Sequence, residues 1–308
     1  MSFPILARLA VPYARMELPG WGKVLKAVGV FDHSRWDGAP SYTIRGKLHG
    51  YMMPLSLESW SERQIYFLGR YYELDTQSFL MACIRPGDTL CDVGGNIGMM
   101  TLLGSRLVGD TGCVHTFEPN PREVQRITKT LADNAIRNVT LHPVGLSDAP
   151  DTLTLSIVTK HSGMGTLATP QGEEADLISE RHTVKVMRGD DELPANLKPP
   201  VTMKIDIEGF ECRAIRGLSA TIAKYHPAVC TEVLGQHLHR AGASVKEIFD
   251  LMLGHGYRAY NIGLRRKWTR QRLSLKLIDK HDESMDTNVA WVYPGTVHEE
   301  RLKPYMVE

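Results

Sequence analysis

The sequence predicts an α/β fold in which helices cover both faces of a mostly parallel sheet. Short apolar segments alternate with helical segments from about residue 89 onward, which is typical of βαβ units. The first of these strands runs into the glycine-rich turn "DVGGNIG", and acidic residues lie at the ends of several later strands. Doubly wound sheets bind ligands beyond the carboxyl ends of their strands, so the same pattern predicts a ligand site there.

The regular part of the chain supplies its elements in order. "TLCDV" predicts a short buried strand, "IGMMTLLGSRLV" a helix, "GCVHTFE" a second strand, and "PREVQRITKTLADNA" a helix with proline in its first turn. "NVTLHPVGL" predicts a third strand. Alternation resumes with strand "VTMKIDI", helix "FECRAIRGLSATIAKY", strand "AVCTEV", helix "SVKEIFDLMLGHG" and strand "YRAYNI", and the last strand is "NVAWVYP".

Two regions depart from this alternation. The period-2 strands "DTLTLSIV" and "RHTVKVM" are joined by the glycine-rich, polar residues 159–180, and we expect an inserted hairpin or flap over the sheet. Residues 1–58 predict an N-terminal extension of strands and helices with a role in acceptor or oligomer contacts. Its first segment favours a helix packed on the protein over one lying on a membrane. The catalytic domain is then expected over residues 59–308.

Composition narrows the class of protein. The chain has 308 residues, of which 43% are hydrophobic, enough for a sizeable core. Its 36 basic and 35 acidic residues nearly cancel, which excludes a general nucleic-acid binder. Five scattered cysteines without a C-x-x-C pair predict reduced, buried thiols. No apolar stretch approaches the roughly 20 residues of a membrane span, and no secretion signal is evident, so a cytoplasmic location is expected.

The glycine-rich turn favours S-adenosylmethionine over a dinucleotide. A dinucleotide site needs G-x-G-x-x-G, and the spacing of Gly94, Gly95 and Gly98 fails in either register. The stretch fits D-x-G-x-N-x-G instead, with Asp92 at the strand end and Asn96 in the turn. A carboxylate at that place would repel a pyrophosphate, whereas it suits the ammonium group of a ligand that carries an amino acid.

Residues at the next two strand ends extend the expected donor site. Glu118 ends the second strand and can accept hydrogen bonds from both ribose hydroxyls, although NAD enzymes share this use of an acid. Ser147 and Asp148 follow the third strand and can hydrogen-bond the adenine edge. For Asp148, an ordinary turn aspartate before Pro150 is the alternative.

The fourth and fifth strands end in the candidate catalytic acids. "MKIDIEGFE" places Lys204, Asp206 and Glu208 on one side of a strand and its exit turn, where burial is costly unless the charges are paired or functional. The alternative is a Lys204–Asp206 ion pair with Glu208 solvated. Glu232 ends the next strand. Asp206 and Glu232 are thus expected side by side, able to deprotonate a hydroxyl or share a divalent cation.

Histidines supply further candidate bases. His237 and His239 follow the fifth strand in "GQHLH", where a helix-surface role is an equal alternative, and His161 lies in the flap. The acids form no recognisable ligand cluster in the sequence, so a divalent metal is left open but not predicted.

Several motifs, in order, resemble the FkbM family of S-adenosylmethionine-dependent methyltransferases. They span about residues 60–235, and they are "RQIYFLGRYYE", "PGDTLCDVGGNIGMMTLL", "GCVHTFEPNP", "VGLSDA", "SGMGT", "KIDIEGFE" and "PAVCTEV". The resemblance implies a Rossmann-like class I methyltransferase sheet of seven strands, of which the last, "NVAWVYP", is antiparallel. It also implies O-methylation of a hydroxyl on a sugar, glycan or secondary metabolite.

The resemblance further implies roles for individual residues, assigned by position. These are the methionine-end loop of Asp92, Gly94, Asn96 and Gly98, the ribose acid Glu118, the adenine contact Asp148, the active-site acids Asp206 and Glu208, and Tyr72 with Glu73 closing over the donor.

We therefore expect methyl transfer from S-adenosylmethionine to a hydroxyl of a small-molecule or glycan acceptor, by in-line displacement. N- or carboxyl-methylation of a small molecule or peptide stays open. An NAD-dependent oxidoreductase is disfavoured by the broken glycine pattern, and a non-catalytic binding module by the intact acids. The basic residues 264–272 favour a solvated surface loop over a site for an anionic acceptor. Whether the chain forms a homodimer stays open.

Overall fold

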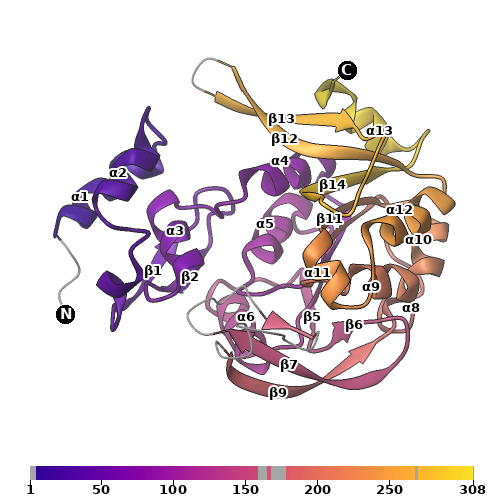
Figure 1. Cartoon of the computed structure of the whole chain (residues 1–308), viewed down its shortest axis with the longest axis horizontal. Coiled ribbons are helices and arrows are strands. Elements are labelled where there is room, and N and C mark those ends of the chain that lie inside the picture. The colour runs from indigo at the N-terminus through magenta and orange to yellow at the C-terminus, as the bar shows by residue number, and fades with distance from the viewer. Residues whose placement is uncertain (1–4, 159–164, 168–177, 268–269, 308) are drawn as a thin grey trace.

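The computed structural model describes residues 5–158, 165–167, 178–267 and 270–307, and a single large sheet lies at its centre (Figure 1). Nine described strands form this sheet. In spatial order they are β15 (Met306–Val307), β13 (Arg270–Leu277), β12 (Arg258–Lys267), β14 (Asp286–Val292), β11 (Ala228–Leu234), β10 (Val201–Ile205), β3 (Thr89–Val93), β4 (Cys113–Phe117) and β5 (Val139–His142).

Chain order reverses at β3, which lies between β4 on one side and β10 on the other. The strands from β5 to β11 pair in parallel, whereas β14 pairs antiparallel with both β11 and β12. The mostly parallel sheet and its antiparallel strand "NVAWVYP" are thus confirmed. The sheet does not stop at seven strands, however, because β13 and β15 extend it beyond β12.

The strand β13 corrects the expectation of a solvated loop over residues 264–272. The described residues of this basic stretch belong to the end of β12 and the start of β13, which pair antiparallel. In β13, Leu273 and Leu275 are buried, whereas Arg272 is exposed. The alternation of apolar and polar residues in "RLSLKL" is the period of a half-buried strand, and it outweighs the local basic charge.

Helices cover both faces of the sheet. The middle strand β3 is buried along its whole length, and its side chains alternate between two cores. Leu90 packs in one core with α4 (Leu74–Cys83) and α5 (Met99–Val108). Cys91 and Val93 pack in the other, with residues of α9 (Glu211–Gly217) and α12 (Val245–Gly254). A parallel strand covered on both faces needs such an apolar run.

Two other elements of the sheet domain differ from those expected from the sequence. The third predicted strand ends at His142 before Pro143, which lacks an N–H, and Gly145–Leu146 joins another sheet as β6. The helix expected over residues 210–225 divides at Leu218 into α9 and α10 (Ser219–Tyr225). The other helical segments are α6 (Pro121–Asp133), α8 (Gly189–Glu192), α11 (Gly235–Arg240), α13 (Val297–Leu302) and η2 (Lys303–Tyr305).

The inserted strands form a second sheet, at the bottom of Figure 1. Its order is β6 (Gly145–Leu146), β9 (Ile178–Met187), β7 (Asp151–Val158) and β8 (Gly165–Thr166), and β7 pairs antiparallel with β9 as expected for an inserted hairpin. Residues 159–164 and 168–177 of the expected flap, His161 included, lie outside the described residues.

The N-terminal elements lie beside the sheet, at the left of Figure 1. They are α1 (Ile5–Arg15), α2 (Trp21–Ala27), η1 (His33–Trp36), β1 (Ser41–Arg45), β2 (Met52–Ser56) and α3 (Trp60–Leu68). They share a core in which Leu25 and Trp36 pack with Phe67, so this core continues past residue 58. Glu62 of α3 forms an ion pair with Arg126 of α6, which ties the N-terminal elements to the sheet domain.

The structure also bears on the cysteines and on the expectation that no helix spans a membrane. All five cysteines are free thiols, four of them buried, while Cys113 is half-buried. Among the helices in the described part of the chain, none combines the length and apolar character needed to cross a bilayer.

Candidate active site

A cavity of about 430 Å³ opens beyond the carboxyl ends of the central strands, where chain order reverses. Its walls come from distant parts of the chain: residues 60–73 before the sheet, the turns after β3 and β4, the inserted sheet, and the segments after β10 and β11. The volume lies within the range of small-molecule and cofactor sites. The cavity is thus where the sequence predicts a ligand.

The glycine-rich turn forms the floor of this cavity. Gly94 has a φ of +84°, and a Cβ there would overlap the backbone carbonyl oxygen of Asp206. Only glycine therefore lets the turn after β3 lie against the turn after β10. Asn96 also has a positive φ, of +47°, and lines the cavity. Gly98, with a φ of +90°, caps the start of α5 behind the cavity.

Asp92 lies beneath the turn and is fully buried. Its Oδ2 accepts a hydrogen bond of 2.6 Å from Thr101, and its Oδ1 lies 3.7 Å from the Nζ of Lys204. Burial raises the pKa of Asp92, against the lowering effect of the Lys204 ammonium. Asp92 is not among the residues that line the cavity. Its carboxylate therefore engages the protein rather than the open space in which the methionine ammonium was expected.

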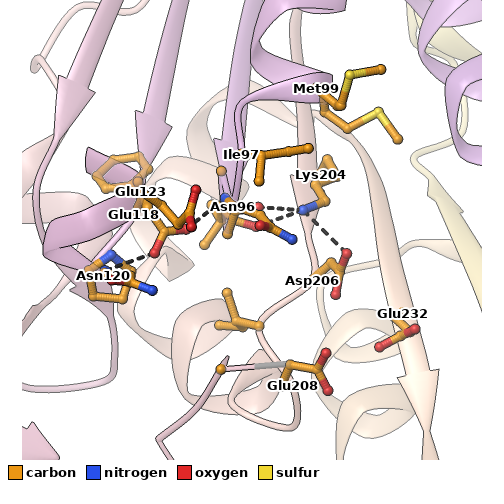
Figure 2. Close-up of a pocket in the computed structure, with 18 of the residues that line it drawn as sticks. Asn96, Ile97, Met99, Glu118, Asn120, Glu123, Lys204, Asp206, Glu208 and Glu232 are labelled. Carbon is orange, nitrogen blue, oxygen red and sulfur yellow. Dashed lines mark hydrogen bonds and ion pairs between the residues drawn. The ribbon is translucent and has the colours of Figure 1, made fainter. Parts of the chain in front are cut away.

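Glu118 lines one end of the cavity, where backbone N–H groups hold its carboxylate (Figure 2). One carboxylate oxygen accepts a hydrogen bond of 2.7 Å from the N–H of Asn96, and the other accepts one of 2.8 Å from the N–H of Asn120. Burial nevertheless raises the pKa of Glu118 to about 7. Because each carboxylate oxygen has further acceptor capacity, both can receive a ligand hydroxyl.

Lys204 crosses the middle of the cavity wall. Its Nζ donates a 2.7 Å hydrogen bond to the carbonyl oxygen of Gly94 and lies 3.3 Å from the carboxylate of Asp206. Burial disfavours its charged form, but the carboxylates of Asp206 and Asp92 more than offset this and raise the pKa of Lys204. The Lys204–Asp206 ion pair weighed from the sequence is therefore present, and it does not keep Asp206 out of the cavity.

Three acids gather at the end of the cavity opposite Glu118. Figure 2 shows Asp206, Glu208 and Glu232 there, carried by the turn after β10 and the end of β11. His237 of α11 also lines the cavity, and its Nδ1 lies 2.8 Å from the Oε2 of Glu208. Burial, reinforced by the charges of Asp206 and Glu208, raises the pKa of Glu232 to about 10. Contact with Glu208 raises the pKa of His237.

An aromatic wall from the segment before the sheet closes this end. Trp60 and Tyr72 lie edge to face with ring centroids 5.4 Å apart, and Tyr71 and Tyr72 are 4.4 Å apart. Glu73 follows, and burial together with the charge of Asp206 raises its pKa to about 8. Tyr72 and Glu73, expected to close over the donor, thus line the cavity. Trp60 was missed, although its place beside "RQIYFLGRYYE" was a signal.

The comparison with protein families matches the FkbM methyltransferase domain over residues 92–259. This chain belongs to the FkbM methyltransferase family. A curated relative, Methyltransferase 1 of Beauveria bassiana (strain ARSEF 2860), is 32% identical over 150 residues. The match covers 43% of this chain and 59% of that protein, so the chain spans less than two thirds of its relative.

This chain is also similar to solved structures of methyltransferases. Methyltransferase FkbM from Methylobacillus flagellatus KT is 16% identical with a TM-score of 0.37, covering 88% of this chain and 60% of that one. A SAM-dependent O-methyltransferase from Thermotoga maritima is 11% identical with a TM-score of 0.40, covering 82% of this chain and 85% of that one.

Two residues expected at the adenine of this FkbM domain do not line the cavity. The hydroxyl of Ser147 donates a 3.1 Å hydrogen bond to Asp148, whose carboxylate lies 3.9 Å from Arg216. The cavity wall of the inserted region is formed instead by apolar side chains, among them Leu155 and Ile157. His239 is exposed on α11 and does not line the cavity either.

Proposed function

We propose that this FkbM-family chain uses S-adenosylmethionine to methylate a hydroxyl group of a small-molecule or glycan acceptor. The observation that carries the proposal is that the two ends of one cavity carry different groups. A backbone-held carboxylate, Glu118, lies at one end, and a group of acids with a histidine lies at the other. The first arrangement suits a ribose diol, and the second suits a group that must lose a proton. Membership of the FkbM methyltransferase family supports methyl transfer as the reaction.

The donor is proposed to lie along the glycine-rich turn. Its ribose would be held by Glu118 and its adenine by the apolar wall that includes Leu155 and Ile157. Its methionine end and sulfonium would lie over Asn96, toward Glu73 and Asp206. A cationic sulfonium is favoured there because carboxylates face this part of the cavity.

Transfer itself would be an in-line displacement. The acceptor oxygen attacks the methyl carbon, a C–O bond forms, and the C–S bond breaks with its electron pair passing to sulfur. An alkyl hydroxyl is hardly acidic at neutral pH, so a base must take its proton as the bond forms. Asp206 is our candidate base, because its carboxylate lines the cavity and is held 3.3 Å from the ammonium of Lys204. Positioning of both reactants supplies the rest of the rate enhancement.

The five free thiols fit a reducing compartment, so we place the enzyme in the cytoplasm. N- and carboxyl-methylation use the same donor site, and the chemistry of the product separates them from O-methylation.

Methyl transfer can be tested with labelled donor. We expect an extract of small metabolites and glycans incubated with the enzyme and methyl-labelled S-adenosylmethionine to yield a labelled methyl ether. Replacing the base (Asp206→Ala) should lower the rate of labelling by at least about 100-fold, the usual contribution of a general base. Calorimetry on both proteins measures donor binding, and exposed Asp250→Asn is the matched control.

Binding of NADH without binding of S-adenosylmethionine would overturn the proposal. Donor binding without labelling of any acceptor would favour a non-catalytic module. A near-normal rate in the Asp206→Ala variant would remove Asp206 from the catalytic set.

A further inference from the structure

Glu208, Glu232 and His237 bring three potential metal ligands together at the acid-rich end of the cavity. One ligand atom from each lies within 4.8 Å of the other two. They come from three separate elements: the turn after β10, the end of β11, and α11. All three side chains are half-buried and line the same cavity.

We propose that Glu208, Glu232 and His237 bind a divalent cation of the Mn²⁺ type at the acceptor end of the cavity. Binding of the cation is independent of the methyltransferase activity proposed above, whereas its role in the reaction rests on that activity.

The ligand set argues for the class of cation. Carboxylate oxygens suit Mg²⁺ and Mn²⁺, whereas an imidazole nitrogen suits first-row transition metals, so two carboxylates with one histidine favour Mn²⁺ or a neighbouring metal over Mg²⁺. Three protein ligands also leave coordination positions open. These positions would face the cavity, as in catalytic metal sites that keep a place for water or substrate.

The spacing is close to that of a bound site. Two ligands on opposite sides of an ion, each at about 2.1 Å, are about 4.2 Å apart. The three ligand atoms are at most 4.8 Å apart, so small rotations of half-buried carboxylates would close the site. The Nδ1 of His237 and the Oε2 of Glu208 are already 2.8 Å apart, so these two ligand atoms face the same point.

The backbone around Glu208 holds this ligand beside His237. Gly209 has a φ of +104°, and a Cβ there would overlap the carbonyl oxygen of His237. The turn after β10 thus packs directly on the backbone of α11. The carboxylate of Glu211 accepts a 2.9 Å hydrogen bond from the N–H of Ile207 and a 3.3 Å one from that of Gly209. The turn is therefore preorganised, which is what a metal site requires of its supporting residues.

Charge around the site also favours a cation. Glu73 and Asp206 lie near Glu232, and the ammonium of Lys204 is already shared between Asp206 and Asp92. Glu232 makes no hydrogen bond or ion pair within the described part of the chain. Partly buried carboxylates without a partner are costly, and a divalent cation would offset that cost.

In the reaction, the cation would act on the acceptor. An acceptor hydroxyl that occupies an open coordination position becomes more acidic and passes its proton to solvent or to the base. Its oxygen then attacks the methyl carbon while the C–S bond breaks toward sulfur, and the cation keeps its oxidation state. A second coordination position would favour acceptors with two neighbouring oxygens, such as the diols of sugars.

The test measures Mn²⁺ binding by electron paramagnetic resonance on the folded chain, without donor or acceptor. We expect one bound Mn²⁺ per chain and a nitrogen coupling from His237 in the pulsed spectrum. His237→Ala should abolish that coupling, and both His237→Ala and Glu232→Gln should weaken Mn²⁺ binding by at least about tenfold. His239→Ala, two residues along α11 and exposed, is the matched control and should leave both unchanged.

Circular dichroism checks that each variant folds, and Glu208→Gln replaces any that does not. Absence of bound Mn²⁺ in the folded wild type, or equal binding by His237→Ala and His239→Ala, would overturn the proposal. Mn²⁺ bound through His237 without any methylation would uphold it while refuting the proposed activity. Methylation that persists after EDTA treatment, in protein that binds no Mn²⁺, would uphold the proposed activity and refute the metal site.

Discussion

At the scale of single residues, close contacts explain why the turn after β3 contains several glycines. Gly94 has positive φ and lies against the carbonyl oxygen of Asp206, so the glycine-rich turn and the turn after β10 meet there. Gly95 would meet the side chain of Thr116 with a Cβ, whereas Gly98 has more room. The glycines that spoil a dinucleotide pattern thus have structural reasons of their own.

Replacing Gly94 by alanine should abolish donor binding and destabilise the fold. The φ of +84° costs a non-glycine residue about 1–2 kcal/mol, and overlap with the Asp206 carbonyl should add about 1–3 kcal/mol. Gly20 has the same φ but open space around it, so Gly20→Ala is a matched control for the backbone strain alone. Urea unfolding and calorimetry with S-adenosylmethionine measure the two effects. Equal losses of stability in both variants would contradict the contact with Asp206.

The raised pKa of Glu118 predicts how stability depends on pH in the donor-free chain. Glu118 has a pKa of about 7 in the fold against about 4.5 when unfolded, so the folded state holds its proton over a range in which the unfolded state releases it. The free energy of unfolding should therefore fall as pH rises from about 4.5 to 7, by up to about 3 kcal/mol from this group.

Glu118→Gln should remove that part of the slope, whatever its effect on absolute stability. Urea unfolding at about pH 5 and pH 7.5 measures the difference for the wild type, the variant and the exposed control Glu300→Gln. An unchanged slope in Glu118→Gln would show that this carboxyl ionises in the fold as easily as in water.

At the scale of elements, one ion pair joins the N-terminal helix α3 to α6 of the sheet domain. Arg126 is 18% exposed, and its partner Glu62 is 2% exposed and also accepts a 2.7 Å hydrogen bond from the N–H of Ser56. Removing one partner of such a pair leaves a buried charge without compensation. The N-terminal elements are thus held against the sheet domain by a contact that the sequence pattern does not show.

Arg126→Met should therefore destabilise the chain by about 3–5 kcal/mol, because it keeps an apolar stem and removes the guanidinium that pairs with Glu62 and donates to the carbonyl oxygen of Pro54. Lys129→Met, on the same helix, removes one partner of the exposed pair with Asp133 and should cost less than about 1 kcal/mol. Urea unfolding of both variants gives the comparison. Similar small losses would mean that Glu62 is solvated once its partner is gone.

The elements also show where sequence patterns were sufficient. The strand "TLCDV" and the helix from Pro121 were predicted within a few residues, because continuous burial and a proline start are local signals. The basic segment 264–272 was wrongly expected as a loop, because charge was weighed above the alternating leucines of β13. The division of "NVTLHPVGL" between two sheets follows from Pro143 together with pairing to β9, which lies far along the chain.

At the scale of the whole molecule, the reversal of chain order at β3 creates the site. It brings residues 60–73, the turns after β3 and β4, and the ends of β10 and β11 around one cavity. Most of the site residues expected from the sequence line it, because strand ends of a parallel sheet share one edge. Asp92, Gly98, Ser147 and Asp148 do not. The three polar side chains among them contact partners within the protein instead.

The sequence by itself determined the alternation of strands and helices, the glycine turn and the acids at the strand ends, since these are periodic or local patterns. Only the tertiary structure decided which of these side chains face the cavity. Glu208, Glu232 and His237 show no ligand spacing along the chain, yet sheet pairing and the packing of α11 on the turn after β10 place them together. Side-chain direction depends on contacts between segments distant in sequence, and no local pattern records those contacts.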